Sequence, residues 1–434
     1  MTATDQGISL LRLATAGSVD DGKSTLVGRL LHDTKQVFAD QLDAVERVSR
    51  ERGLDGADLA LLTDGLRAER EQGITIDVAY RYFATPRRRF ILADTPGHVQ
   101  YTRNMVTGAS TAQLAVVLVD ARNGVVEQTR RHAAVAALLR VPHVVLAVNK
   151  MDLAGYEEKV FATIADEFTE YAARLGVPEV TSIPISALAG DNVVEPSASM
   201  DWYGGPTLLE HLEAVDVEED PAAHPARFPV QYVLRPQLPG DFRDYRGYAG
   251  QLVSGVLRPG DEVVVLPSGQ RSTIAGIDRL GEQDVEVAFA PQSVTVRLAD
   301  DLDVSRGDVI APVAAAPQAT QDVTATVCHV ADRPLRAGDR VLLRHATKTV
   351  KAIVRSLDAR LEICGLFEVP DPESLSANEI GRVTLRVAAP LPLDEYTANR
   401  RTGSFLLIDE SDGATLTAGM VGTPLTAAVP AGAQ

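Results

Sequence analysis

Near its start the chain reads Gly17-Ser18-Val19-Asp20-Asp21-Gly22-Lys23-Ser24. Two glycines separated by four residues, then a lysine and a hydroxyl residue, have the spacing of a phosphate-binding loop. The glycines let the backbone turn sharply, so that amide N–H groups and the start of the following helix face negative charge. Working outward, an apolar run at 11–15 predicts a strand before the loop, and 23–31 predicts a helix after it.

Three further motifs follow along the chain, each directly after a short apolar run. They read Asp94-Thr95-Pro96-Gly97-His98, then Asn149-Lys150-Met151-Asp152, then Ser186-Ala187-Leu188. The runs at 114–119 and 144–148 are continuously apolar, which is typical of strands buried on both faces of a parallel sheet. A single motif has a real false-positive rate, but four in this order predict a protein that binds and hydrolyses a guanine nucleotide.

The residue types at the first two motifs suit phosphate chemistry. We expect Lys23 to contact the β- and γ-phosphates, and the Ser24 hydroxyl and Asp94 carboxylate to hold Mg²⁺. The Gly97 N–H can reach the γ-phosphate, and His98 stands where an attacking water could be oriented. Phosphoryl transfer needs positioning and charge neutralisation more than covalent help, so these groups are sufficient.

The last two motifs carry the choice of base. The Asp152 carboxylate can accept hydrogen bonds from N1–H and the 2-amino group of guanine, and adenine offers neither donor. An unpaired buried carboxylate costs about 1–3 kcal/mol or more, so GTP and GDP are the predicted nucleotides. Asn149 ties the loop together, the Lys150 stem can lie over the ring, and backbone at Ser186 supplies an N–H. The predicted nucleotide contacts are Gly17, Ser18, Val19, Asp20, Asp21, Gly22, Lys23, Ser24, Thr25, Asp94, Thr95, Pro96, Gly97, His98, Asn149, Lys150, Asp152, Ser186, Ala187 and Leu188.

Length and pattern together predict three domains. A chain of 434 residues is too long for one ordinary core. Strands and helices alternate up to about residue 215, which predicts an α/β domain with a mostly parallel sheet and helices on both faces. An acidic, Pro-containing stretch at 217–227 reads as a linker, and short Val-rich runs beyond it predict two β-barrels. The expected limits are 1–218 for the nucleotide-binding domain and 225–315 and 320–430 for the barrels.

Composition excludes several classes of protein. The formal net charge of −17 argues against a nucleic-acid binder, because phosphate backbones require a basic surface. The most apolar stretch, 133–148, is interrupted by Arg140 and Pro142 and is too broken to span a bilayer. Cys328 and Cys364 have no metal or redox spacing, and no secretion signal is apparent, so we expect a cytoplasmic protein.

Several other polar residues are expected to be structural. The run Arg87-Arg88-Arg89 lies at an expected hairpin turn, which predicts a solvated tip and no phosphate patch. His132 and His143 flank a core strand and have no partner at metal-ligand spacing. Tyr245 has two readings that the sequence leaves open, because it could contact a partner or pack the barrel.

The stretch 69–77, Glu-Arg-Glu-Gln-Gly-Ile-Thr-Ile-Asp, followed by the motif at 94–98, resembles translational elongation factors of the Tu and 1-alpha type. The resemblance covers the whole length, including two barrels after the first domain. It implies that the hydroxyl of Thr75 completes the Mg²⁺ shell in the GTP state. It also implies that Val19 and Ile74 flank His98 as an apolar gate, so the expected catalytic residues are Lys23, Thr75 and His98.

A narrower resemblance extends over longer segments. The segments 64–83, 97–105, 202–209, 245–250 and 304–308 are similar to the GTPase subunits of bacterial heterodimeric sulfate adenylyltransferases. This resemblance implies that GTP hydrolysis here drives synthesis of adenylylsulfate and pyrophosphate from ATP and sulfate on a smaller ATP-sulfurylase catalytic subunit. The chain has no second phosphate-binding loop after Ser24, so a fused adenylylsulfate kinase domain is not expected. We expect the partner to act on the segments around Thr75 and Asp94.

Two alternatives remain at this point. A translation factor that delivers aminoacyl-tRNA would share the motifs but would present a basic RNA surface, and both the net acidity and Asp21 weigh against it. Asp21 stands where translation factors usually have histidine. A scaffold with an inactive nucleotide site would not need Lys23, Ser24, Thr75 and His98 intact, so it is disfavoured.

Overall fold

The computed structural model describes residues 9–36, 39–51, 59–62, 78–97, 102–217, 220–236 and 245–422. These residues form two compact units. The first contains residues up to 217 together with 362–367, and the second contains the remaining described residues from 220 onward. Thr75 and His98 lie outside the described residues, so their expected roles stay predictions.

A six-stranded sheet forms the centre of the first unit. Its strands are β1 (Ser9–Gly17), β2 (Ala79–Ala84), β3 (Arg88–Asp94), β4 (Leu114–Asp120), β5 (His143–Asn149) and β6 (Val180–Pro184). They lie in the order β2-β3-β1-β4-β5-β6, and every neighbouring pair is parallel except β2–β3. All seven residues of β4 are buried, as its continuous apolar run predicts.

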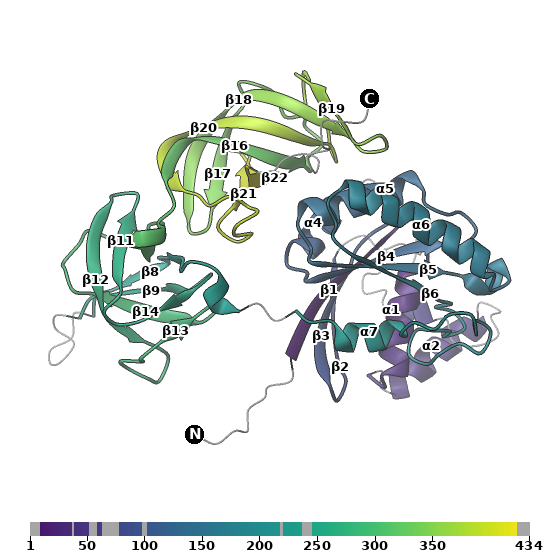
Figure 1. The fold of residues 1–434 in the computed structure, drawn as a ribbon. Coiled ribbons are helices and arrows are strands. Elements are labelled where there is room, and N and C mark those ends of the chain that lie inside the picture. The colour runs from purple at the N-terminus through teal and green to yellow at the C-terminus, as the bar shows by residue number, and fades with distance from the viewer. Residues whose placement is uncertain are drawn as a thin grey trace. The chain divides into compact units, whose positions relative to one another are not determined.

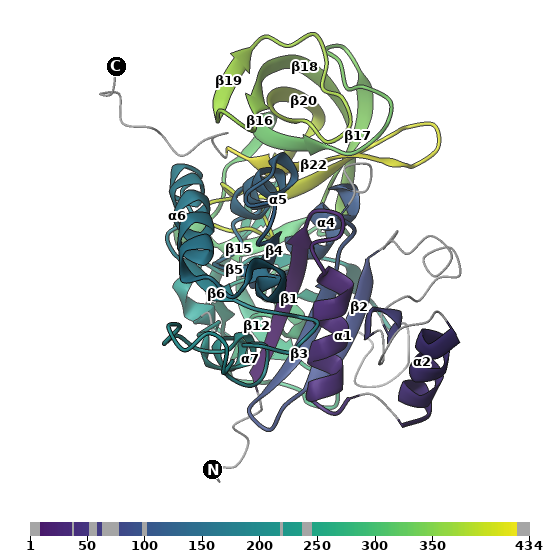
Figure 2. The same ribbon diagram turned by 90° about the vertical axis from the view of Figure 1, so that its right-hand side faces the viewer.

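Helices cover both faces of this sheet (Figure 1). They are α1 (Lys23–Asp33), α2 (Ala39–Glu51), α4 (Thr102–Ser110), α5 (Glu127–Leu138), α6 (Glu158–Arg174) and α7 (Leu208–Ala214), with short 3₁₀ turns at Leu59–Leu62 and Met151–Ala154. Leu26 and Leu30 of α1 share a core with Leu208 and Leu212 of α7 on one face. Helices α4, α5 and α6 pack side by side on the other face (Figure 2). The predicted α/β domain with a mostly parallel sheet is confirmed.

The turn between β2 and β3 corrects one expectation. Arg88 is not at a solvated tip: its side chain is buried, and its guanidinium donates to the Ser9 hydroxyl and to the carbonyls of Leu212 and Val215 at 2.6–3.0 Å. The last two carbonyls lie at the C-terminal end of α7, where backbone acceptors have no partner within the helix. Arg88 therefore satisfies the end of α7, while its neighbours Arg87 and Arg89 are exposed.

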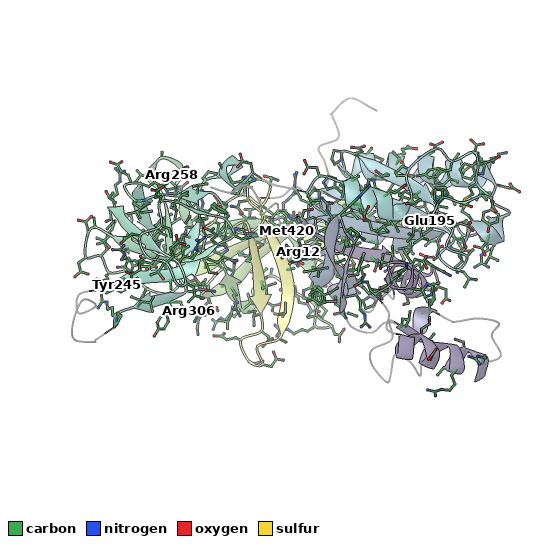
Figure 3. The ribbon with its side chains drawn as sticks, turned by 90° about the horizontal axis from the view of Figure 1, so that it is seen from below. Arg12, Glu195, Tyr245, Arg258, Arg306 and Met420 are labelled. Carbon is green, nitrogen blue, oxygen red and sulfur yellow. The ribbon has the colours of Figure 1, made fainter. Side chains whose placement is uncertain are left out.

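The second unit consists of antiparallel sheets. The first has the order β7-β15-β11-β12-β14-β9-β8, with β7 (Phe228–Pro229), β8 (Tyr232–Leu234), β9 (Gly247–Gln251), β11 (Glu262–Leu266), β12 (Gln270–Asp278), β14 (Ser293–Leu298) and β15 (Val309–Pro312). Strands β10 (Val256–Leu257) and β13 (Ala288–Phe289) pair beside it. Short 3₁₀ turns lie at Pro221–Ala223 and Val313–Ala315. Tyr245, labelled in Figure 3, donates to Asp278 at 2.8 Å within this sheet, and the ring of Tyr248 is buried in its core.

The second sheet closes on itself. Its order is β17-β21-β22-β16-β20-β18-β19, and an additional pairing of β17 with β18 completes a barrel. The strands are β16 (Ala319–His329), β17 (Arg340–His345), β18 (Lys348–Glu362), β19 (Phe367–Pro370), β20 (Ile380–Pro392), β21 (Ser404–Ile408) and β22 (Thr415–Val421). Inside this unit Arg227 makes a two-bond ion pair with Asp394 at 2.8 and 2.9 Å. A hydrogen bond from Asn399 to Ser254 at 2.9 Å joins the same two regions.

Candidate nucleotide-binding site

The predicted motifs meet at one edge of the parallel sheet. Strand β1 ends at Gly17, β3 at Asp94, β5 at Asn149 and β6 just before Ser186. In a parallel sheet the carboxyl ends of the strands all lie at the same edge, and ligands of open α/β sheets bind there. The fold thus brings together groups that are more than 160 residues apart in the sequence.

Lys23 is the central cation of the phosphate-binding loop. Its side chain is buried, and Nζ donates to the carbonyls of Gly17 and Ser18 at 2.9 and 2.7 Å. Burial lowers the pKa of Lys23, while the negative charges of Asp21 and Asp94 oppose that shift. The backbone of the loop therefore curls around an ammonium group that is already desolvated, as phosphate binding requires.

Glycines at two positions bring the loop segments into close approach. Gly22 has φ +91°, and a Cβ atom there would lie 2.5 Å from Nδ2 of Asn149. A Cβ atom at Gly97 would lie 2.8 Å from the carbonyl oxygen of Ser18 and would also meet Lys23. Both positions exclude a side chain because of their neighbours, and Gly22 does so by its left-handed backbone as well.

Asp94 ends β3 with its side chain buried, and Oδ1 accepts from the Thr15 hydroxyl at 3.0 Å. The Thr95 hydroxyl donates to the carbonyl of Thr15 at 2.5 Å, which fixes the start of this loop against β1. The Ser24 hydroxyl and Asp94 carboxylate are hard oxygen ligands of the kind Mg²⁺ prefers when water and phosphate oxygens complete its shell. Within the described part of the chain no three His, Cys, Asp or Glu side chains cluster as a closed metal site.

Asn149 connects the two halves of the site. Its Nδ2 donates to the carbonyl of Asp21 in the phosphate-binding loop at 2.7 Å. Its Oδ1 accepts from the backbone N–H of Ala187 at 2.9 Å. Nearby, the Ser186 hydroxyl donates to Oδ1 of Asp152 at 2.7 Å. One buried amide therefore fixes the distance between the phosphate-binding loop and the segment with the predicted base contacts.

Asp21 is placed differently from an ordinary nucleotide contact. Its carboxylate is 4% exposed, and Oδ2 accepts from the backbone N–H of Ser18 at 2.5 Å. Burial raises the pKa of Asp21, and the positive charge of Lys23 opposes that shift. The side chain thus braces the loop from within, which is a role the sequence pattern does not reveal.

His132, on α5, supports the same loop from behind. It is fully buried, and its Nδ1 accepts from the Gly17 N–H at 3.0 Å. Burial, with smaller contributions from Lys23 and Arg131, lowers the pKa of His132 to about 3, so the ring is neutral. Nε2 of Gln128 lies 2.9 Å from Nε2 of His132. A neutral ring whose Nδ1 accepts must carry its proton on Nε2, so the Gln128 amide must be turned to present its oxygen there. His132 was expected to be structural, and the structure adds the specific contact that it makes, which is to the Gly17 N–H.

Arg29 is a second residue that the motifs do not indicate. It projects from α1, and its Nε donates to the Ala187 carbonyl at 3.1 Å while Nη2 donates to the Leu188 carbonyl. Leu188 itself is 69% exposed and directly follows the predicted base contacts Ser186 and Ala187. The only sequence signal for Arg29 is its place on the helix that follows the phosphate-binding loop.

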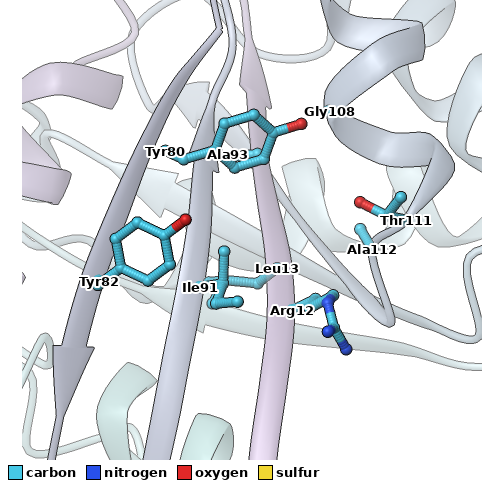
Figure 4. A pocket seen from close by; sticks show the side chains of 9 residues that line it. All are labelled: Arg12, Leu13, Tyr80, Tyr82, Ile91, Ala93, Gly108, Thr111 and Ala112. Atoms are coloured by element: carbon cyan, nitrogen blue, oxygen red, sulfur yellow. The ribbon is translucent and has the colours of Figure 1, made fainter. Parts of the chain in front are cut away.

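A hollow of about 210 Å³ on the first unit is separate from these groups. Figure 4 shows Tyr80 and Tyr82 of β2 beside Ile91 of β3 and Arg12 of β1. Tyr82, Ile91 and Arg12 are cross-strand partners on this face. Its lining contains a single charged side chain and no phosphate-binding backbone, so the nucleotide motifs are not directed at this hollow.

Comparisons with known proteins agree with the motifs. Residues 9–218 match the model of the Elongation factor Tu GTP binding domain, residues 248–311 match Elongation factor Tu domain 2, and residues 322–422 match the GTP-eEF1A C-terminal domain-like family. No helix among the described residues is long and apolar enough to cross a membrane.

Curated relatives cover nearly the whole chain. A "Bifunctional enzyme CysN/CysC" of Mycobacterium tuberculosis is 58% identical over 97% of this chain and 69% of the relative. A "Sulfate adenylyltransferase subunit 1" of Aeromonas salmonicida is 50% identical over 98% of this chain and 89% of the relative. One of the same name from Citrobacter koseri is 49% identical, again over 98% and 89%. The chain belongs to the sulfate adenylyltransferase subunit 1 family, whose domains are those of elongation-factor-Tu-like GTPases.

Proposed function

We propose that this chain is the GTP-hydrolysing subunit of a sulfate adenylyltransferase and that GTP or GDP lies along the carboxyl edge of the sheet. The observation that carries the proposal is a pair of hydrogen bonds of the Asn149 side chain. Its amide nitrogen donates to the Asp21 carbonyl, and its amide oxygen accepts from the Ala187 N–H. It fixes a phosphate-binding loop and a base-recognition segment at one spacing. Such a spacing fits a nucleotide that spans both segments.

At the phosphate end, Lys23 would leave the Gly17 and Ser18 carbonyls to contact the β- and γ-phosphates. Ser24 and Asp94 would hold Mg²⁺, which neutralises charge that develops on the transferred phosphoryl group. Thr75 would complete the Mg²⁺ shell, and His98 would orient the attacking water. The remaining predicted contacts, Thr25 in the first turn of α1 and Thr95 and Pro96 after β3, would contribute backbone and packing around the phosphates.

At the base end, Asp152 would accept from N1–H and the 2-amino group of guanine. Its Oδ1 already accepts from the Ser186 hydroxyl, so the carboxylate is oriented before the nucleotide arrives. The exposed side chain of Leu188 offers an apolar surface that one face of the purine can cover. A nucleotide without the 2-amino and N1–H donors leaves the carboxylate without those partners and binds more weakly.

The energy of GTP hydrolysis is proposed to drive formation of adenylylsulfate and pyrophosphate from ATP and sulfate. The adenylyl transfer would occur on a smaller partner subunit in the cytoplasm, where this chain is also expected. The words "subunit 1" in the names of the relatives imply a companion. Some relatives are longer: the chain spans 69% of the Mycobacterium tuberculosis relative, whose printed name is that of a bifunctional enzyme. The coupling to the partner would pass through the segments around Thr75 and His98.

The test is reconstitution. The chain is co-purified with the small subunit from the same source, and adenylylsulfate synthesis is measured with GTP, with GDP and with a non-hydrolysable GTP analogue. Of the three nucleotides, only GTP should raise the amount of adenylylsulfate above the small amount that ATP and sulfate form at equilibrium. Equal synthesis under all three conditions would overturn the coupling. A translation factor function is not favoured by the relatives, and a filter-binding assay with aminoacyl-tRNA should show no retention.

A further inference from the structure

Asp120 is a buried carboxylate at the nucleotide edge to which no role has yet been assigned. It is the last residue of β4 and lies in register with Asn149 at the end of β5. Its side chain is 2% exposed. A carboxylate at such a position must be fully paired, because an isolated buried charge is very costly.

Two cations pair with Asp120. Arg122 donates from Nη2 to Oδ2 at 2.6 Å and from Nε to Oδ1 at 3.0 Å, and its backbone N–H also reaches Oδ1 at 3.0 Å. Nζ of Lys150 lies 3.0 Å from Oδ2. Burial alone would raise the pKa of Asp120, but these hydrogen bonds outweigh it and hold the pKa far below its usual range. The carboxylate is thus ionised at neutral pH.

Lys150 is held at a second point as well. Its Nζ donates to the carbonyl of Asp20 in the phosphate-binding loop. Its backbone has φ +62°, a left-handed conformation that a residue with a side chain adopts only when its surroundings impose it. The ammonium group is therefore committed to Asp120 and to the loop, and these two contacts fix the position of the four-carbon stem.

We propose that Asp120 and Arg122 are positioning residues for guanine recognition: they hold the Lys150 side chain where its stem covers one face of the bound purine. The inference rests on the proposed function and adds a group of residues to it. Asp120 acts through Lys150 and does not touch the nucleotide. Arg122 keeps Asp120 oriented through two parallel bonds, a geometry that a lysine at this position could not reproduce.

Arg122 has a further electrostatic effect. Its side chain is half exposed, and the negative charge of Asp152 acts on it in addition to that of Asp120. The positive charge of Arg122 therefore lies near the carboxylate that is proposed to accept hydrogen bonds from guanine.

The experiment measures dissociation of GDP labelled with N-methylanthraniloyl from the full chain, chased with unlabelled GDP. For Asp120→Asn the expected rate is about tenfold faster, the size of one lost charge-assisted hydrogen bond. For Arg122→Gln it is about threefold faster, because Lys150 keeps its bond to Asp120. Asp394→Asn is the matched control: it breaks a two-bond Arg–Asp pair in the second unit and should leave the rate unchanged.

A double-mutant cycle separates positioning from a general structural role. In a Lys150→Met background, Asp120→Asn should add less than about twofold, because the residue through which Asp120 acts is gone. Additive effects, or an unchanged rate for both Asp120→Asn and Arg122→Gln, would overturn the inference. If Asp120→Asn does not fold, Arg122→Gln still decides between the outcomes.

The proposed function is checked in the same assay by its own variant. Preference for GDP over XDP should be unchanged in Asp120→Asn, since the stem of Lys150 covers either purine. The same preference should reverse in Asp152→Asn. A switch in Asp152→Asn with no effect of Asp120→Asn would contradict only this inference, whereas no switch in Asp152→Asn would contradict the proposed function.

Discussion

The two units bury polar side chains in different ways. In the first unit several buried polar groups converge: Asp94, Asp120 and Asn149 end β3, β4 and β5 at one sheet edge, and Lys23 begins the helix after β1. In the second unit buried polar side chains make separate structural pairings, as Arg227 does with Asp394. His329, for example, bonds to Thr417, its register partner on the neighbouring strand. Buried polar side chains occur in both places, so convergence, and not burial alone, marks the site.

The largest expected effect is on the choice of nucleotide in the first unit. Asp152→Asn removes an anionic acceptor and exchanges it for an amide that can pair with the 2-carbonyl of xanthine. Two hydrogen bonds to a charged group correspond to about 3–6 kcal/mol, so GDP affinity should fall at least about a hundredfold. Calorimetric titration with GDP and XDP measures the change. An unchanged GDP preference would remove the reason for placing the base at this edge.

The next largest effect is on the stability of the second unit, where a buried ion pair is expected to have no influence on nucleotide binding. Asp394→Asn leaves the buried guanidinium of Arg227 without its charge partner, since the Arg227 side chain is 6% exposed. Breaking a buried ion pair costs about 3 kcal/mol, so the free energy of unfolding of this unit should fall by about that amount. Urea unfolding measures it. Nucleotide affinity should stay the same. A loss of affinity would show that this buried pair in the second unit also contributes to nucleotide binding.

Two glycines with almost the same φ angle give a matched pair. Gly22 has φ +91° and Gly260 has φ +93°, but only Gly22 has a neighbour, Asn149, within contact of an added Cβ atom. Both alanine variants should lose about 1–2 kcal/mol of stability because of the left-handed backbone.

Gly22→Ala should in addition weaken GDP binding about tenfold, because the clash displaces Asn149. Equal GDP affinity in the two variants would mean that Asn149 does not set the spacing of the site.

The smallest effect is a pH dependence. The pKa of His132 is about 3 in the folded chain and near 6.5 when unfolded, so the unfolded chain binds the extra proton first as pH falls. Stability from His132 is complete above pH 6.5 and is lost progressively below it, by about 1 kcal/mol between pH 6 and 5. Unfolding measured at both values should show that His132→Gln loses about 1 kcal/mol less than the unmodified chain. Burial also lowers the pKa values of His329 and His345, so these residues lose stability in the same direction in both proteins.

Much of the fold could be predicted because its determinants are local. Continuous apolar runs identify β4 and β5, and glycine and lysine spacing identifies the loop before α1, without knowledge of any distant contact. The predicted domain limits and nucleotide contacts stay predictions, and Thr75 and His98 lie outside the described residues.

The residues that the sequence did not indicate act over long separations. His132 bonds to a glycine 115 residues away, and Arg29 to a carbonyl 158 residues away. Arg88 was expected at a solvated tip, but it satisfies the end of a helix 124 residues later. Asp120 had a usable signal, since a carboxylate at the carboxyl end of a buried parallel strand lies at the ligand edge. Its pairing with Lys150 needed the register of β4 and β5.

The measurement that tests the central claim most directly is a calorimetric titration of the unmodified chain with GDP and with ADP in the presence of Mg²⁺. Loss of two hydrogen bonds to Asp152 predicts that GDP binds at least about a hundredfold more tightly than ADP, with one site per chain. Equal affinities, tighter binding of ADP, or no binding of either would contradict the account.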